Sequence, residues 1–147
     1  MVFQDPLFAL NPVMRVREQV AEVVRAHRAN AAAADLLDLV GLPPSARILN
    51  SYPHQLSGGE RQRVTIAQAL ACKPALVIAD EPFTALDATR VVELTSLFRR
   101  LREQLGTAFL VISHSPGVLA RLADQVLMIR GGAIAAQGTP RQVFRHV

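Results

Sequence analysis

Residues 75–82 have the sequence Ala-Leu-Val-Ile-Ala-Asp-Glu-Pro, an apolar run that ends in two acids and a proline. The run does not alternate between apolar and polar residues, which is typical of a strand buried on both faces, as in a parallel sheet. A second apolar run, at 108–112, is followed shortly by His114. Between the two runs, apolar residues recur at helical spacing from Val91 to Leu105. The order strand, helix, strand predicts the parallel crossover of an α/β fold.

The part of the chain before this unit is expected to be helical. Apolar residues recur at helical spacing over 16–24 and 36–40, and residues 43–56 are expected to form an irregular connection. The sequence Ser-Gly-Gly-Glu at 57–60 has the form of a capping box, which predicts a helix that continues to about residue 72. Beyond residue 112 the pattern predicts a short helix, a hairpin around Gly131-Gly132 and the start of a last helix, at 117–123, 125–137 and 139–140.

The composition indicates a globular chain with enough apolar residues for a core, because 50% of its 147 residues are hydrophobic and 19% are charged. No apolar stretch approaches the roughly 18–20 residues that span a bilayer. The single cysteine, Cys72, excludes an intrachain disulfide and a cysteine-based zinc site. The net charge is +4, but aromatic residues make up only 5% of the chain, so platforms for base stacking are scarce and no nucleic-acid partner is expected.

The start of the helix at Ser57 has two interpretations. Its first backbone N–H groups lack partners within the helix, and the helix dipole favours negative charge there. Gly58 and Gly59 would let a phosphate approach the backbone without interference from a Cβ atom. The same residues are also compatible with an ordinary capped helix that follows a turn.

The acids that follow the first strand form a second candidate site. In α/β sheets ligands bind at the carboxyl ends of the strands, where Asp80 could hold Mg²⁺ and Glu81 could polarise a water for attack on phosphorus. His114, after the second strand, could donate a hydrogen bond to a phosphate. Each of these residues can also be an ordinary exposed strand-end residue, and Asp87 can be a helix cap.

In their order and spacing these pieces resemble the motifs of the ATP-binding-cassette (ABC) ATPases. The matching segments lie at 3–6 (Phe-Gln-Asp-Pro), 56–63 (Leu-Ser-Gly-Gly-Glu-Arg-Gln-Arg), 76–82 (Leu-Val-Ile-Ala-Asp-Glu-Pro), 85–87 (Ala-Leu-Asp) and His114.

The resemblance implies an α/β fold that is part of the P-loop NTPase fold of ABC ATPases. A helical signature subdomain would be joined to the C-terminal half of a mainly parallel sheet core. Residues 1–74 would hold the Q-loop, the helical subdomain and the signature helix. Residues 75–147 would hold the Walker B, D-loop and switch-histidine part of the nucleotide-binding core.

The resemblance also implies ATP and Mg²⁺ as ligands and a role for each residue near them. Asp80 matches the Walker B aspartate, on the Mg²⁺ side, and Glu81 matches the catalytic glutamate, the general base for water. His114 matches the switch histidine near the γ-phosphate. Gln4 matches the Q-loop glutamine, which senses Mg²⁺ and the attacking water and links to the membrane partner.

Two further motifs imply protein partners. Ser57, Gly58 and Gly59 match the signature motif, which contacts the γ-phosphate of ATP held by the opposite subunit, and Asp87 matches the D-loop aspartate at that interface. The expected partners are a second ABC ATPase domain, identical or different, and transmembrane permease subunits on which the helical stretch before Ser57 would dock.

Within the family, residues 3–12, 52–57 and 131–140 are similar to importers of the dipeptide, oligopeptide and nickel group. The expected function is therefore ATP hydrolysis that energises solute import, of a peptide or nickel, with a solute-binding protein as an indirect partner. The expected location is the cytoplasmic face of the inner or plasma membrane, as a peripheral subunit.

The sequence departs from the family pattern at several places. The one lysine, Lys73, precedes a proline and cannot be the lysine of a P-loop. The family's Walker A loop would precede Gln4, so the resemblance covers only the later part of the family's domain, and the chain by itself is expected to bind ATP weakly and to hydrolyse it negligibly. Milder departures are Glu60, where the group has Met or Gln, Phe83, where it has Thr, and Ser115, where it has Asp.

Two alternatives to the main hypothesis are open. The chain could be a truncated cassette without catalytic competence that acts at most as an interaction module. It could also be a soluble ABC ATPase with no transport role. The main hypothesis requires that Asp80, Glu81 and His114 lie on one side of the molecule.

Overall fold

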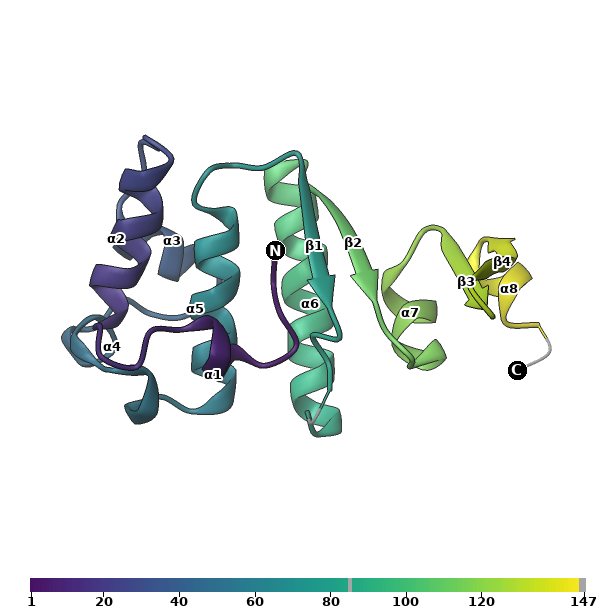
Figure 1. Ribbon diagram of the computed structural model, residues 1–147, viewed down its shortest axis with the longest axis horizontal. Helices are drawn as coiled ribbons and strands as arrows, with labels where there is room; N and C mark the ends of the chain where they lie inside the picture. Colours follow the sequence, from purple (N-terminus) through teal and green to yellow (C-terminus); the bar gives the residue numbers. More distant parts are fainter. Residues whose placement is uncertain (85, 146–147) are drawn as a thin grey trace.

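The computed structural model describes residues 1–84 and 86–145 (Figure 1). The first part of the chain is helical, with a 3₁₀ turn η1 before the longest of these helices: α1 (Pro6–Ala9), α2 (Val16–Ala26), α3 (Ala33–Leu39), α4 (Ala46–Asn50), η1 (Pro53–Gln55) and α5 (Gly58–Leu70). The second part alternates strands and helices: β1 (Leu76–Asp80), α6 (Ala88–Leu105), β2 (Ala108–Ile112), α7 (Pro116–Leu122), β3 (Val126–Arg130), β4 (Ala133–Gly138) and α8 (Pro140–Val143).

The parallel crossover predicted from the sequence is confirmed. Strands β1 and β2 pair in parallel, with Leu76 opposite Ala108 and Asp80 opposite Ile112, and α6 connects them. The N-terminus adds a further parallel contact on the other side of β1, where the Val2 N–H donates to the Ile78 carbonyl oxygen at 2.8 Å. Both predicted strand ends therefore lie at one edge of the sheet, and the chain beyond Val2 leads to the same edge.

Helices α5 and α6 pack beside each other between the other helices of the first part and the β1–β2 sheet (Figure 1). The expected inward residues of α5 are buried, and Ile66 and Leu70 are at most 1% exposed. On α6 the ring of Phe98 is buried and lies 5.1 Å from the ring of Phe109 on β2. Gly106 ends α6 in the left-handed conformation, with φ of +65°, as its position after the last apolar residue predicts.

The prediction that β1 is buried on both faces is wrong. Val77 and Ala79 face the core, but Leu76 is 51% exposed, and Leu110 and Ile112 of β2 are each 47% exposed. Among the described residues, no helix covers the face of β1 and β2 that these leucine and isoleucine side chains share. The absence of alternation in the sequence thus indicates apolar residues on both faces of the sheet, of which one is covered by α5 and α6.

The prediction that residues 43–56 are irregular is also wrong in part, because α4 and η1 lie there. The hydroxyl of Ser45 accepts a hydrogen bond from the Ile48 N–H at 3.3 Å and so caps α4, while the buried Ile48 side chain joins the core. A helix of five residues is too short to show a periodic pattern in the sequence. The short α1 was missed for the same reason, although Asp5 caps it by accepting from the Leu7 N–H at 2.8 Å.

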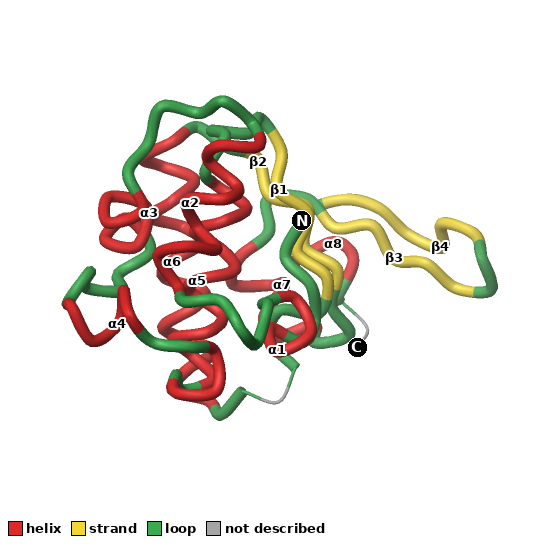
Figure 2. Tube along the Cα trace, turned by 60° about the vertical axis from the view of Figure 1, so that its left-hand side comes forward, coloured by secondary structure: helices red, strands yellow, loops and turns green. Residues whose placement is uncertain are grey.

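The hairpin formed by β3 and β4 extends away from helices α1 to α6, as Figure 2 shows, and α8 packs against it. Its turn residues Gly131 and Gly132 have φ of +55° and +79°, which the two-residue turn requires of both positions. In the described segments, no helix is both long enough and apolar enough to pass through a bilayer.

Candidate functional site

Glu81 and His114, which are 33 residues apart in the chain, are in contact at the end of the sheet. The Glu81 Oε1 atom lies 2.9 Å from the His114 Nδ1 atom and accepts a hydrogen bond from the His114 backbone N–H at 3.1 Å. The parallel register causes this contact, because Asp80 is opposite Ile112 and the two strands end side by side. The His114 ring is 79% exposed and the Glu81 side chain 21% exposed, so the pair faces outward from the sheet edge.

The Glu81 carboxylate is held in its ionised form. Burial acts to raise its pKa, but hydrogen bonds from the His114 ring and the Thr84 hydroxyl outweigh burial, and the net effect is a lowered pKa. The Thr84 hydroxyl donates to Glu81 Oε2 at 3.2 Å. Glu81 itself adopts φ of +46°, a left-handed conformation that costs a non-glycine residue on the order of 1–3 kcal/mol. The turn therefore places a charged carboxylate at a strained backbone position.

Asp80 ends β1 and is half-buried. Among the hydrogen bonds and ion pairs between described residues, none uses the Asp80 carboxylate, so its oxygens are available to a cation. No group of three or more His, Cys, Asp or Glu residues that could hold a metal occurs in the described chain. A carboxylate that stands alone fits Mg²⁺, which in phosphate-handling sites takes one or two protein ligands and completes its shell with water and substrate phosphates.

Gln4 lies on the segment that leaves the sheet after Val2. It lines a cavity of about 560 Å³ together with Gly58 and Thr84. This cavity thus borders the N-terminal segment around Gln4, the start of α5 and the loop after β1. The arrangement brings an exposed amide from the N-terminal segment to the same region as the Glu81 loop.

The start of α5 forms the capping box that the sequence predicts. The Ser57 N–H donates to Glu60 Oε2 at 2.8 Å, and the Glu60 N–H donates to Ser57 Oγ at 3.2 Å. The Arg47 guanidinium pairs with Glu60 Oε1 at 2.5 Å. Burial raises the pKa of Glu60, but hydrogen bonds from Arg47 and Ser57 lower it by more. Since Ser57 Oγ accepts within the box, its O–H remains free to donate outward, beside the unpaired N–H groups of the two glycines.

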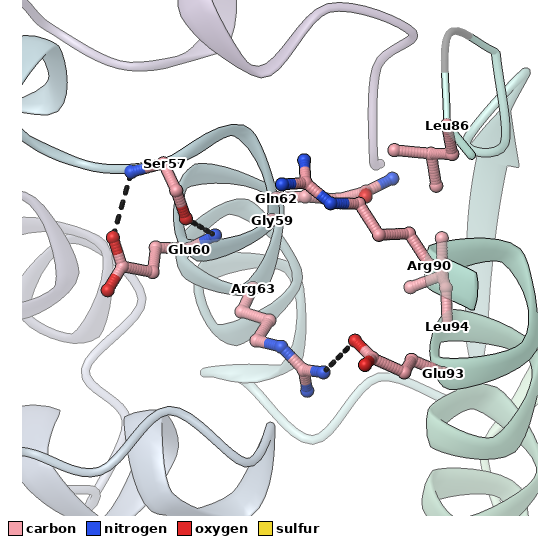
Figure 3. Close-up of a pocket in the computed structure, with 9 residues that line it drawn as sticks. All are labelled: Ser57, Gly59, Glu60, Gln62, Arg63, Leu86, Arg90, Glu93 and Leu94. Atoms are coloured by element: carbon pink, nitrogen blue, oxygen red, sulfur yellow. Dashed lines mark hydrogen bonds and ion pairs between the residues drawn. The ribbon is translucent and has the colours of Figure 1, made fainter. Parts of the chain in front are cut away.

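A smaller cavity, of about 230 Å³, lies between the start of α5 and α6 (Figure 3). Ser57 and Gly59 line it from α5, and Arg90 and Glu93 line it from α6. A Cβ atom added to Gly58 would lie 3.6 Å from Arg90 Nη1, so this guanidinium lies close to the glycine backbone.

Asp87 caps α6, accepting a hydrogen bond from the Arg90 N–H at 2.9 Å, as the structural interpretation of this residue predicts. The Arg90 Nε atom also lies 3.4 Å from Asp87 Oδ2. Ala85, quoted with Asp87 in the motif at 85–87, lies outside the described residues.

The structure therefore collects the candidate residues in two groups. Asp80, Glu81 and His114 lie at the sheet edge, on one side of the molecule as the main hypothesis requires, and Ser57 to Gly59 form the tip of α5. Gly58 of the second group lines the larger cavity together with Gln4 and with Thr84, whose hydroxyl donates to Glu81 of the first group.

Sequence reasoning gave no role to several residues that line these cavities, among them Gln62, Thr84 and Arg90. For Gln62 a signal was present, because it precedes Ile66 and Leu70 by four and eight residues and so lies on the apolar face of α5. A polar residue on such a face has a specific partner when it is buried. Thr84 and Arg90 carry no comparable signal, since a turn and the first turn of a helix are ordinary positions for polar residues.

The comparisons with known proteins agree with this geometry. The family model described as ABC transporter matches residues 1–84. A peptide import ATP-binding protein of Brucella melitensis is 44% identical over 99% of this chain, which spans 45% of that relative. The oligopeptide transport ATP-binding protein OppD of Haemophilus influenzae is 43% identical over 99% of this chain, which spans 47% of that protein. The chain thus spans about half the length of these curated relatives.

Two solved structures share the fold. CbiO1 of Clostridium perfringens, part of the ABC transporter complex CbiONQ, superposes with a TM-score of 0.82 at 27% identity, covering 99% of this chain and 58% of CbiO1. The ATP-binding cassette MJ0796, in a dimeric structure bound to ADP and Pi, superposes with a TM-score of 0.75 at 28% identity, covering 95% of this chain and 62% of that one. The fold is that of a partial ABC ATPase cassette, and the chain belongs to the ABC transporter family.

Proposed function

We propose that this chain provides the water-activating and signature parts of an ATP-hydrolysing subunit that energises import of a solute, most simply a peptide, across a membrane. The observation that carries the proposal is the contact of the Glu81 carboxylate, whose pKa is lowered, with His114. The neighbouring Asp80 carboxylate has no partner among the described residues. The names of the relatives, which refer to peptide import and oligopeptide transport, support the choice of solute.

In the proposed mechanism Glu81 accepts a proton from the attacking water as the water oxygen bonds to the γ-phosphorus and the bond from that phosphorus to the ADP oxygen breaks. Its Oε2 atom is oriented by Thr84 and its Oε1 atom by His114. A turn of the exposed His114 ring toward the phosphate would free Oε1 for the water and supply a hydrogen bond to the developing charge. Asp80 and Gln4 would hold Mg²⁺, which when bound offsets the charge of the phosphates.

The tip of α5 would act on a nucleotide held by another cassette. Its donors are the Ser57 hydroxyl and the N–H groups of Gly58 and Gly59, and they point out of the helix end. The dimer of MJ0796 is a precedent for such pairing in a structure of the same fold. We propose a second ABC ATPase domain and transmembrane permease subunits as partners, a solute-binding protein as an indirect one, and a peripheral position on the cytoplasmic face of the membrane.

The proposal is tested on the chain in complex with the membrane subunits that purify with it. Mg²⁺-dependent ATP hydrolysis is measured for the unmodified complex, for Glu81→Gln, and for Glu103→Gln, a matched control at an exposed position of α6. Glu81→Gln is expected to lower turnover by about 10²–10⁴-fold, because it removes the proton acceptor, and Glu103→Gln is expected to change nothing. Equal turnover in Glu81→Gln and the unmodified complex would refute the assigned base.

The same measurement on the 147-residue chain alone is expected to give negligible hydrolysis. No Gly-Lys-Ser or Gly-Lys-Thr sequence occurs in these residues, so the backbone cradle and lysine for the phosphates must come from outside them. Hydrolysis by the chain alone that Glu81→Gln abolishes would contradict this expectation. Association with nucleic acid in place of membrane subunits would favour a soluble, non-transport ATPase.

A further inference from the structure

Gln62 is a buried polar residue on α5, five positions after Ser57. Its exposed fraction is 6%, and its Nε2 atom donates a hydrogen bond to the carbonyl oxygen of Pro82, the residue that follows Glu81. Pro82 is itself buried. A buried carbonyl oxygen without a hydrogen-bond partner is unfavourable, so the side chain of Gln62 stabilises this turn by pairing with the Pro82 carbonyl oxygen.

The remaining hydrogen bonds of the turn come from β2, from His114 just after β2, or from the turn itself. The Glu81 N–H donates to the Ile112 carbonyl oxygen at 2.9 Å, and the Thr84 N–H donates to the Glu81 carbonyl oxygen at 3.2 Å. Among the described residues, Gln62 makes the one hydrogen bond from α5 to the Glu81–Thr84 turn. The turn is thus held from two sides, by the sheet and by α5.

Gln62 also lies where the two cavities meet. It lines the smaller one with Ser57 and Gly59, and the larger one with Gln4 and Thr84. Figure 3 shows its side chain extending from α5 toward the side of the pocket on which Leu86 lies. Because α5 is continuous from Gly58 to Leu70, a movement of its tip moves Gln62 with it.

We infer that Gln62 is a positioning residue that couples the tip of α5 to the Glu81 turn, so that a ligand bound at Ser57–Gly59 changes the placement of the Glu81 carboxylate. The inference rests on the proposed function for the role of Glu81 as the general base. The coupling between α5 and the Glu81 turn is a property of the fold. In this role Gln62 acts through its hydrogen bond to the Pro82 carbonyl oxygen.

The coupling is tested by amide hydrogen exchange on the full chain, with the variants Gln62→Met and Gln68→Met. Methionine keeps the length of glutamine and removes the donor, and Gln68 is a half-buried residue of the same helix without a hydrogen bond from its side chain to a described residue. In Gln62→Met the amides of Glu81, Thr84 and His114 are expected to exchange about tenfold faster, while those of β2 and α6 keep their rates. Gln68→Met is expected to leave all of them unchanged.

A merely structural role of Gln62 predicts a different pattern, in which exchange accelerates across β2 and α6 as well. That pattern, or unchanged exchange at Glu81 and Thr84, would overturn the inference. In the complex with membrane subunits, Gln62→Met is expected to lower kcat for ATP about tenfold with little change in KM, since ligand contacts are kept. If Glu81→Gln leaves hydrolysis intact, the proposed function fails, whereas the exchange result still decides the coupling.

Discussion

The two halves of the candidate site are built in opposite ways. The tip of α5 is organised by neighbours in sequence, since Ser57 and Glu60 are three residues apart. The sheet edge is organised by distant residues, since Glu81 meets His114 only because β1 and β2 pair in parallel. Damage to the core should therefore disturb the sheet edge most, and loss of a cap should disturb the helix tip alone.

The largest expected effect is at Phe83, which anchors the turn after β1 in the core. Its ring is 6% exposed and meets the ring of Phe98 edge-on at 6.0 Å. Phe83→Ala is expected to lower the free energy of unfolding by about 3–5 kcal/mol, because a large buried side chain leaves a cavity. Urea denaturation of the chain measures this loss.

The matched control for Phe83 is Phe8, a phenylalanine that is 92% exposed. Phe8→Ala is expected to change the free energy of unfolding by less than about 0.5 kcal/mol. If Phe83→Ala were as mild as Phe8→Ala, the Glu81 turn would not depend on the core, and the contrast between the two halves would fail.

A smaller effect is expected at the helix tip. Ser57→Ala removes the side chain that caps α5 and should lower the free energy of unfolding by about 1 kcal/mol. Ser96→Ala, at an exposed position inside α6, is the control and should be neutral or slightly stabilising, because alanine has the higher helix propensity. Thermal unfolding followed by circular dichroism compares the two, and equal midpoints would show that the cap contributes nothing.

The same contrast explains what could be predicted from the sequence. The α5 cap, the Gly106 helix end and the β1–α6–β2 crossover were predicted because each depends on local spacing or on a long periodic pattern. Helix α4 was missed because its stability comes from one buried residue, Ile48, and a serine cap.

At the site, spacing and strand order predicted that Glu81 and His114 share an edge, but they could not predict the atoms that hold Glu81. The Thr84 hydroxyl and the Gln62 bond to Pro82 depend on how the turn folds back on α5, and the left-handed backbone at Glu81 has no signature in its residue type. Such contacts are decided by packing between elements that are distant in sequence.

The smallest expected effect concerns the pH dependence of the helix tip. Because the pKa of Glu60 is lowered in the folded chain, mainly by hydrogen bonds from Arg47 and Ser57 against the opposing effect of burial, ionised Glu60 stabilises the fold above its unfolded pKa of about 4.3. This stabilisation decreases once the pH falls below the unfolded-state pKa, and it is lost as the pH falls through the lowered pKa of the folded state. Arg47→Ala should reduce the loss, since it removes the partner of Glu60.

The Arg47 side chain is 61% exposed, so solvent screening limits the contribution of the pair to at most about 1 kcal/mol. Urea unfolding at pH 7 and pH 3 gives the difference in the free energy of unfolding between the two pH values, and this difference should be smaller for Arg47→Ala than for the unmodified chain. The control Arg17→Ala, at an exposed position of α2, should keep the full difference. An identical pH dependence in Arg47→Ala and the unmodified chain would mean that Glu60 is held by its capping box alone. The helix tip would then be organised entirely within residues 57–60, which would make its contrast with the sheet edge sharper still.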